Sequence, residues 1–423
     1  MTPVLIGGLL VLLALSVPIA VTLGLSAAAA LQTTGTPLVM LAQSVYESLD
    51  SFGLMAIPFF VLAGSLMQSG GIAQRLIDLA NALVGWIKGG LGAVVVLTSM
   101  FFATMSGSSS ATTAAIGSVL IPAMEKKGYP RSLAGAIAAS SGELGVIIPP
   151  SIPMIVYALS ANVSVADLFL AGILPGIFIG LSLIATVYVL ARVKGFDVVG
   201  HTTLSQWTGN LLHALKRAWL AVLMPVVILG GIYSGLFTAT EASVVAVIYG
   251  LLIGVFVYKE LRWSDLLGLL GRSAVTSSII LLIVGFAAIF AYMLTVNQIP
   301  HIVGEFVSGI SKNPLVFLLA VNVLLFVTGM FMETLAAIII LAPILAPAAI
   351  QYGIDPVHFG TIMVVNLAIG MVTPPVGVNL FVVCQVAKLR LEQLVRPLLI
   401  FLGVLIVDVL VISYVPALTT WFK

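Results

Sequence analysis

The chain of 423 residues is 61% hydrophobic and only 8% charged, with a net charge of +2 at pH 7. Soluble globular proteins carry roughly 25% charged residues, so this composition excludes a soluble protein and indicates that lipid is the main solvent. The small net charge gives no reason to expect nucleic acid as a partner. A single cysteine, Cys384, excludes a disulfide framework and any multi-cysteine metal site.

Apolar runs in chain order predict an all-α polytopic membrane protein, because open sheet edges are excluded from hydrocarbon. We divide it into a first repeat (1–200), an interfacial linker (201–218) and a second repeat (219–423). In the first repeat we expect scaffold passes within 4–68, an amphipathic arm 72–87, an interrupted region 90–123, a broken helix 132–161 and a closing pass 168–191. In the second we expect scaffold passes within 219–295, an arm 299–310, an interrupted region 315–350, a broken helix 357–387 and a closing pass 397–417.

A constant offset between glycines and prolines supports the division into two repeats. Pro149-Pro150 and Pro374-Pro375 lie 225 residues apart (374 − 149 = 225), and the same offset pairs Gly145 with Gly370. A repeat of this kind, with a break at the same place in each copy, is typical of secondary transporters that bind their cargo near the membrane midplane.

The basic residues fix the expected orientation of the two repeats. Fifteen of the 17 Lys and Arg residues fall on one side of the membrane if 90–123 and 315–350 each enter and leave on the same side, and the positive-inside rule makes that side cytoplasmic. The sequence therefore predicts inverted-topology repeats with two re-entrant helical hairpins and two helices broken at Pro-Pro.

Four polar or helix-breaking stretches fall where the membrane should be driest. They are 104–113, 140–153, 328–334 and 366–375. Proline removes a backbone donor and frees carbonyl oxygens from helical pairing, and unwound backbone at this depth is tolerated where it lines a site. Carbonyl and hydroxyl oxygens without charge suit an alkali cation such as sodium better than a transition metal.

Two carboxylates, Glu143 and Glu333, lie near these breaks, and intramembrane carboxylates are candidates for function. Either residue could carry a proton or brace a break through backbone amides. An intramembrane enzyme that uses one of them would lack a paired nucleophile and base, because no Ser–His pair, paired Asp or metal motif accompanies them. A channel fits less well than alternating access, which rigid inverted hairpins favour.

At these stretches the sequence resembles the large membrane subunit of tripartite ATP-independent periplasmic (TRAP) transporters. The matching segments are Ser106–Tyr129, Ser141–Tyr157, Asp167–Gly176, Gly329–Pro343 and Gly353–Leu380. The resemblance covers nearly the whole chain and is dense in both halves. It implies an elevator-type symporter of the inner membrane that is driven by a sodium gradient, with Na⁺ as coupling ion and no other cofactor.

The resemblance also implies which residues bind the ions. Sodium site 1 would consist of Ser106, Gly107, Ser109, Gly142, Gly145, Ile148 and Pro150. Sodium site 2 would consist of Gly329, Met330, Thr334, Gly370, Met371 and Thr373. Candidates for the substrate pocket are Ser108, Ser110, Ser141, Glu333, Asn366 and Asn379.

Members of the family work with a small membrane subunit of four helices and a soluble periplasmic substrate-binding protein. No such small-subunit region precedes the large subunit here, so we expect it on a separate chain. The expected cargo is an organic acid of the C4-dicarboxylate or sialic acid type. The alternative is a self-sufficient sodium:organic-anion symporter of the same elevator architecture, which would transport without a binding protein.

Overall fold

The structure is a computed structural model that describes residues 2–33, 35–196, 204–299, 301–302, 305, 309 and 311–423. Over these residues the fold is helical without strands. Eight of the described helices are long and apolar enough to cross a membrane, or up to nine if one bent pair counts as a single span. The prediction of an all-α polytopic membrane protein is thus confirmed at this level.

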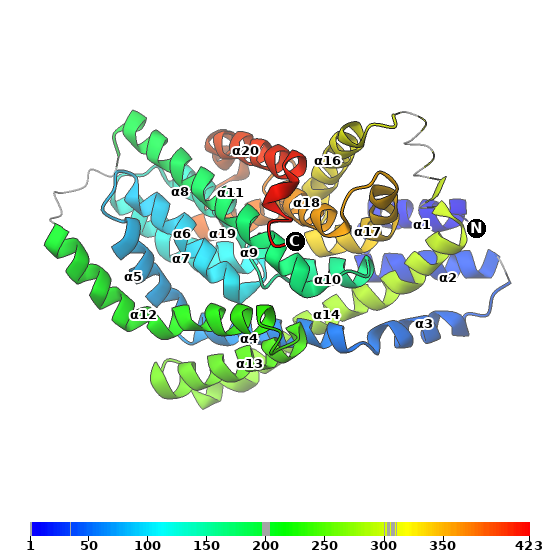
Figure 1. Cartoon of the computed structure of the whole chain (residues 1–423), viewed down its shortest axis with the longest axis horizontal. Coiled ribbons are helices and arrows are strands. Elements are labelled where there is room, and N and C mark those ends of the chain that lie inside the picture. The colour runs from blue at the N-terminus through cyan, green and yellow to red at the C-terminus, as the bar shows by residue number, and fades with distance from the viewer. Residues whose placement is uncertain are drawn as a thin grey trace.

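One group of helices, which we call the scaffold, lies along the lower edge and the right-hand end of the molecule in Figure 1. It consists of α1 (Thr2–Ala14), α2 (Ile19–Thr33), α3 (Val39–Leu49), η1 (Phe52–Met55), α4 (Ala56–Ser69), α12 (Leu204–Tyr233), α13 (Ala239–Leu252), η2 (Ile253–Val257) and α14 (Trp263–Val296). Within it α4 packs against α13, while α2 and α3 pack against α14.

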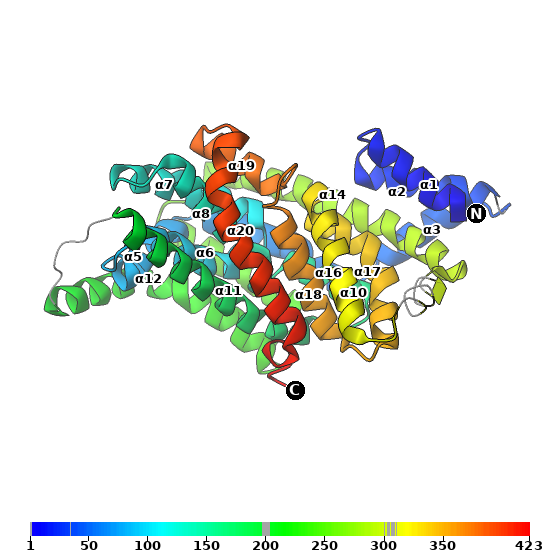
Figure 2. The same cartoon turned by 90° about the horizontal axis from the view of Figure 1, so that it is seen from above.

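A helix at the position of the first expected arm, α5 (Ile72–Val84), connects the scaffold to the rest of the fold. It packs against α12 on one side and α6 on the other. Its buried residues Ile72, Leu76 and Leu79 recur at helical spacing. Figure 2 shows α5 and α12 at the opposite end of the molecule from α1 and α2.

The remaining helices form a second group, which we call the core. From the first half it contains α6 (Gly90–Ser106), α7 (Ser109–Lys126), α8 (Arg131–Gly142), α9 (Leu144–Ile147), α10 (Ile152–Ser160) and α11 (Val165–Lys194). From the second half it contains α16 (Pro314–Phe331), α17 (Thr334–Gln351), α18 (Pro356–Gly370), α19 (Val378–Ala387), α20 (Leu391–Tyr414) and the short η3 (Pro416–Leu418). Helices α7 and α17 begin 225 residues apart (334 − 109 = 225), and so do α8 and α18 (356 − 131 = 225). The order of core helices therefore repeats with the offset of the proline pairs.

Polar side chains determine where several core helices begin. In each case the side chain accepts a hydrogen bond from a backbone N–H in the first turn and so caps the helix. These caps are Ser108 for α7, Ser151 for α10, Ser164 for α11, Glu333 for α17 and Asp355 for α18. Because Ser108, Ser151 and Glu333 directly follow interruptions, the chain leaves one helix and starts the next within a few residues.

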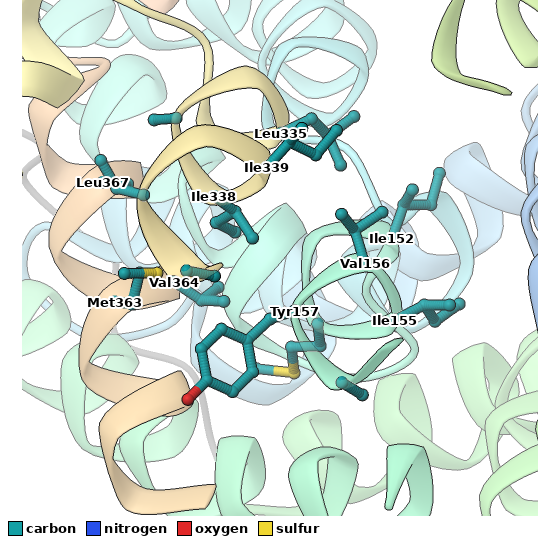
Figure 3. Packing of buried hydrophobic residues seen from close by; sticks show 14 of the residues in the cluster. Ile152, Ile155, Val156, Tyr157, Leu335, Ile338, Ile339, Met363, Val364 and Leu367 are labelled. Atoms are coloured by element: carbon teal, nitrogen blue, oxygen red, sulfur yellow. The ribbon is translucent and has the colours of Figure 1, made fainter. Parts of the chain in front are cut away.

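The two halves of the core are interleaved. Helix α7 of the first half packs against α19 of the second, and α10 of the first half packs against α17 of the second. Figure 3 shows Val156 and Tyr157 of α10 facing Ile338 of α17 and Val364 of α18. The Tyr157 hydroxyl also donates a hydrogen bond of 2.8 Å to the carbonyl oxygen of Pro356. Neither half can therefore bury its apolar faces without the other.

Replacing Gly360 by alanine is expected to destabilise this interface. A Cβ atom on Gly360 would lie 2.2 Å from Cε1 of the buried Tyr157 ring, and overpacking of this kind costs about 1–3 kcal/mol. The control is Gly403→Ala on α20, where a Cβ would meet no atom within 4 Å. Thermal unfolding of the detergent-purified protein should show a lower melting temperature for Gly360→Ala alone. Equal melting temperatures of the two variants would contradict the packing argument.

The region between the two repeats differs from the sequence prediction. Helix α12 begins at Leu204, so the described part of the expected linker 201–218 is helical. Hydropathy marks only the lipid-facing part of a helix, whereas an amphipathic helix continues into the interface on a polar face. The expected second arm, 299–310, falls largely outside the described residues.

The loop before α18 is fixed by an ion pair outside the membrane-spanning segments. Asp355 contacts the Lys423 ammonium group and accepts hydrogen bonds from the backbone N–H groups of Val357 and His358. Burial raises the pKa of Asp355, but the hydrogen bonds and the charge of Lys423 outweigh it, and the pKa lies below its ordinary value. The ion pair therefore stabilises the fold above the ordinary pKa, and this contribution is lost as the pH falls through the lowered pKa.

An Asp355→Asn variant should accordingly be less stable than the unaltered protein at pH 7, by up to about 1 kcal/mol for a partly exposed pair. Asparagine still caps α18, so only the charge is removed. Below about pH 4 the difference should shrink as the pH falls towards the lowered pKa, because the carboxyl group is protonated first in the unfolded chain and then in the folded one. Thermal melting at neutral and acidic pH measures the difference, and an equal difference at both would show that the ion pair is not its source.

Candidate functional site

The first interruption of the core places a tight turn against the first double proline. Helix α6 ends at Ser106, and Gly107 follows with a left-handed φ of 58° that glycine adopts readily. A Cβ atom on Gly107 would lie 3.3 Å from the carbonyl oxygen of Pro150. The turn between α6 and α7, which we call tip 1 (residues 106–109), therefore touches the break between α9 and α10.

Oxygen atoms gather around tip 1. The hydroxyl groups of Ser106 and Thr112 lie 2.7 Å apart, and Thr112 donates to the carbonyl oxygen of Ser108 at 2.8 Å. Gly145 of α9 lies directly against this cluster, since its Cβ would be 2.4 Å from the Thr112 hydroxyl and 2.6 Å from the Ser108 carbonyl oxygen. Only glycine at position 145 lets the broken helix come this close.

The second interruption repeats the arrangement. Helix α16 ends at Phe331 and α17 begins at Thr334, so we call residues 329–334 tip 2. A Cβ on Gly370, at the end of α18, would lie 2.5 Å from Cα of Gly329. The N–H of Gly377 donates to the carbonyl oxygen of Met330 at 3.0 Å. Tip 2 is thus held against the second double-proline break, as tip 1 is against the first.

The two tips meet at Met371. Its sulfur atom lies 2.9 Å from the Thr334 hydroxyl of tip 2 and 3.9 Å from the Ser109 hydroxyl of tip 1. Ser109 and Thr334 are the first residues of α7 and α17. The starts of these two helices, which carry the positive ends of the helix dipoles, therefore converge on one point from opposite halves of the chain.

Most residues expected in sodium site 1 and sodium site 2 lie at these contacts. Those at the tip-to-break contacts are Ser106, Gly107, Gly145 and Pro150 in the first half and Gly329, Met330, Thr334, Gly370 and Met371 in the second. Gly142 lies against Thr113, Ser109 faces Met371, and the side chain of Ile148 packs towards Gly176 of α11. The hydroxyl of Thr373 donates to the Ile369 carbonyl oxygen of its own helix at 2.9 Å.

A cavity of about 660 Å³ opens beside tip 1 between core and scaffold. Three of the expected substrate residues, Ser108, Ser110 and Glu333, line it. Three others lie elsewhere, each with its own partner. Ser141 donates to the carbonyl oxygen of Ile137, Asn366 donates to the side chain of Asn322, and Asn379 donates to Glu143.

The scaffold contributes residues to this cavity that the sequence reading did not select. They are Val61, Gly64, Ser65 and Gln68 of α4 and Thr276, Ile279, Ile280 and Ile283 of α14. The signal that could have identified some of them is the polar Ser65 and Gln68 within an otherwise apolar helix. Among the described residues that line the cavity there is no Lys or Arg, so an anion there would depend on hydroxyl groups, backbone N–H groups and helix dipoles.

The fold and this site define a polytopic helical membrane transporter. The fold is similar to a solved structure, "Crystal structure of the Alcanivorax borkumensis YdaH transporter reveals an unusual topology". The match covers 91% of this chain and 88% of that chain, with a TM-score of 0.66. The sequence identity is 18%, so this likeness concerns the fold alone.

Comparison with known sequences shows to which family of transporters the chain belongs. The family described as "Tripartite ATP-independent periplasmic transporter, DctM component" matches residues 6–418. The "C4-dicarboxylate TRAP transporter large permease protein DctM" of Pseudomonas aeruginosa is 45% identical over 90% of this chain and 88% of its own. The "Isethionate TRAP transporter permease protein DctMQ" of Oleidesulfovibrio alaskensis is 43% identical over 99% of this chain, which spans 66% of that relative. The chain belongs to the DctM family of TRAP transporter large permeases, which confirms the resemblance seen in its sequence.

Proposed function

We propose that this chain is the transmembrane transport subunit of a sodium-coupled importer of an organic acid. The observation that carries the proposal is the convergence of both tips at Met371, with residues of both tips lining one cavity of about 660 Å³. Two equivalent breaks from opposite halves of a transporter are the arrangement expected of ion and substrate sites at a repeat interface.

The donor groups at the breaks fit sodium. Hydroxyl oxygens of Ser106, Ser109 and Thr334 and backbone carbonyls of residues such as Pro150 lie where each tip meets a break. Such uncharged oxygen donors suit a hard monovalent cation. Bound sodium would supply positive charge next to a cavity whose described lining has no Lys or Arg, and it would thereby favour an anionic cargo in the same site.

The cargo is a small organic anion of the C4-dicarboxylate or sialic acid type. One relative is named for a C4-dicarboxylate and another for isethionate, and both of these are anions. In the cavity, the hydroxyls of Ser108 and Ser110 supply hydrogen bonds, while Glu333 is engaged by the backbone N–H of Leu335 at 3.2 Å. Substitutions at these three positions are therefore expected to change cargo preference.

The transport cycle follows from the division into core and scaffold. The interrupted pairs α6–α7 and α16–α17 act as re-entrant hairpins of an elevator that moves against the scaffold in the bacterial or archaeal inner membrane. The cavity contacts the middle of α14, from Thr276 to Ile283, and the Trp263 end of this helix follows the basic residues Lys259 and Arg262. By the positive-inside rule that end is cytoplasmic. Since a second cavity lies along the other end of α14, from Val284 to Thr295, we take the core to stand towards the cytoplasm with the site facing inward. A small permease subunit and a periplasmic binding protein complete the transporter.

Uptake into proteoliposomes tests the proposal. The chain is reconstituted with its small permease subunit, and labelled C4-dicarboxylate, isethionate or sialic acid is offered with and without the matching binding protein. Uptake should require both the binding protein and an inward sodium gradient. Uptake driven by a proton gradient in sodium-free buffer would contradict sodium coupling, and uptake by this chain alone would identify a self-sufficient symporter instead.

A further inference from the structure

A carboxyl group is buried in the first broken helix and is only half partnered. Glu143, at the junction of α8 and α9, has no exposed surface. The side-chain amide of Asn379, from the other half of the chain, donates to its Oε1 atom. Its Oε2 atom has no hydrogen-bond partner. Burying a carboxylate with one unpartnered oxygen costs folding free energy unless a cation or a proton accompanies it.

Further buried oxygen atoms without a partner belong to residues of α7, α8 and α19, three helices that pack against one another at this carboxyl group. They are Oδ1 of Asn379, Oγ1 of Thr113 and Oγ of Ser140. Asn379 Oδ1 belongs to the amide that already contacts Glu143. The Thr113 hydroxyl would lie 1.8 Å from a Cβ atom on Gly142, the residue next to Glu143. The four side chains therefore come from helices that meet at one place.

Helical spacing directs the remaining groups to the same place. Ser140 and Glu143 are three residues apart and share a face of the helix at the end of α8. Ser109 and Thr113 are four residues apart and share a face of α7, and the Thr113 hydroxyl lies against Gly142 of α8. The faces that carry these oxygens thus point at each other across the contact between α7 and α8.

We propose that Glu143, Asn379, Thr113 and Ser140 form a third sodium site, an inference that rests on the proposed sodium-coupled function. One carboxylate, one amide oxygen and two hydroxyls are hard oxygen donors with a single negative charge, which matches one monovalent cation. A divalent ion would call for more carboxylates, and the described residues contain no group of three His, Cys, Asp or Glu that could hold a metal.

The proposed third site adjoins residues expected in the other two. Glu143 directly follows Gly142 of sodium site 1, and the backbone N–H of Asn379 donates to the carbonyl oxygen of Met371 of sodium site 2 at 3.2 Å. A cation held here would fix these two neighbours together. Occupancy of the third site should therefore strengthen sodium binding at both neighbours, and they should strengthen it in return.

The test is equilibrium binding of radioactive ²²Na⁺ to the purified complex of this chain with its small permease subunit. Glu143→Gln keeps the shape of the side chain but removes its charge, and it should bind one Na⁺ fewer per large subunit than the unaltered protein. Thr113→Val removes a single neutral donor and should weaken one class of site about tenfold. Thermal unfolding of each variant shows whether it is folded.

The outcomes separate this inference from the proposed function. If the unaltered complex binds no sodium, the proposed sodium coupling fails. If it binds sodium and Glu143→Gln binds the same number of ions with the same affinity, the third site is overturned and the carboxyl carries a proton instead. Should Glu143→Gln fail to fold, equal binding by Thr113→Val and the unaltered complex would overturn the inference in the same way.

Discussion

Replacing Gly370 by alanine is expected to weaken sodium-dependent uptake about ten- to hundredfold. The added Cβ atom would lie 2.5 Å from Cα and 2.6 Å from the carbonyl carbon of Gly329. Both are backbone atoms, which cannot turn aside as a flexible side chain can. Tip 2 must then lift away from the second break, and the contact between Thr334 and Met371 opens with it.

The measurement is the sodium concentration that gives half-maximal uptake in proteoliposomes. The matched control is Gly117→Ala on α7, where the added Cβ would meet side-chain atoms at ordinary distances of 3.4 and 3.6 Å. Both variants should insert and melt as folded proteins, but only Gly370→Ala should need more sodium. An unchanged sodium requirement in Gly370→Ala would mean that the contact between tip 2 and α18 does not form the ion site.

The breaks were predictable because local chemistry alone produces them. Proline removes a backbone donor of the helix, and a double proline removes two in succession. Pro149-Pro150 and Pro374-Pro375 lie in the breaks that follow α9 and α18. Ser108 and Glu333, which cap α7 and α17, stand directly after the interruptions in the sequence. The positions of tips and breaks along the chain could thus be inferred from the sequence without tertiary information.

The partners of these elements could not be predicted in the same way. Nothing in the local sequence indicates that Asn379 pairs with Glu143, 236 residues away, or that Asn366 pairs with Asn322 rather than lining the cavity. These pairings depend on which helix faces meet after the halves interleave. The start of α12 was missed for a different reason. Hydropathy underestimates the length of a helix whose polar end continues into the membrane interface.

A second cavity shows where the core is expected to move. It has a volume of about 600 Å³ and lies between scaffold and core, where Ala287, Ala288 and Ala291 of α14 line it together with residues of α10 and α17. The cavity beside tip 1 is lined by Thr276 and nearby residues of the same helix. The two cavities therefore occupy successive stretches of α14, and the second one is free space on the outer half.

A tryptophan in place of Ala288 should lock the transporter with its site facing inward. The large side chain would fill the outer cavity and prevent the core from sliding along α14, so that uptake falls to background. Because the substitution lies away from the tips, we expect sodium to raise the melting temperature of this variant as much as that of the unaltered protein. The combination of intact ion binding with lost uptake is the expected signature of a blocked movement.

The matched control is Leu282→Trp on the same helix, since Leu282 is 46% exposed and lines neither cavity. This variant carries the same bulk towards lipid and should transport normally. If Ala288→Trp also transports normally, the core does not move against the outer half of α14, and the elevator assigned to this scaffold is wrong. If both variants lose uptake, bulk anywhere on α14 is harmful and the outer cavity has no special role. Only a loss confined to Ala288→Trp ties transport to closure of that space.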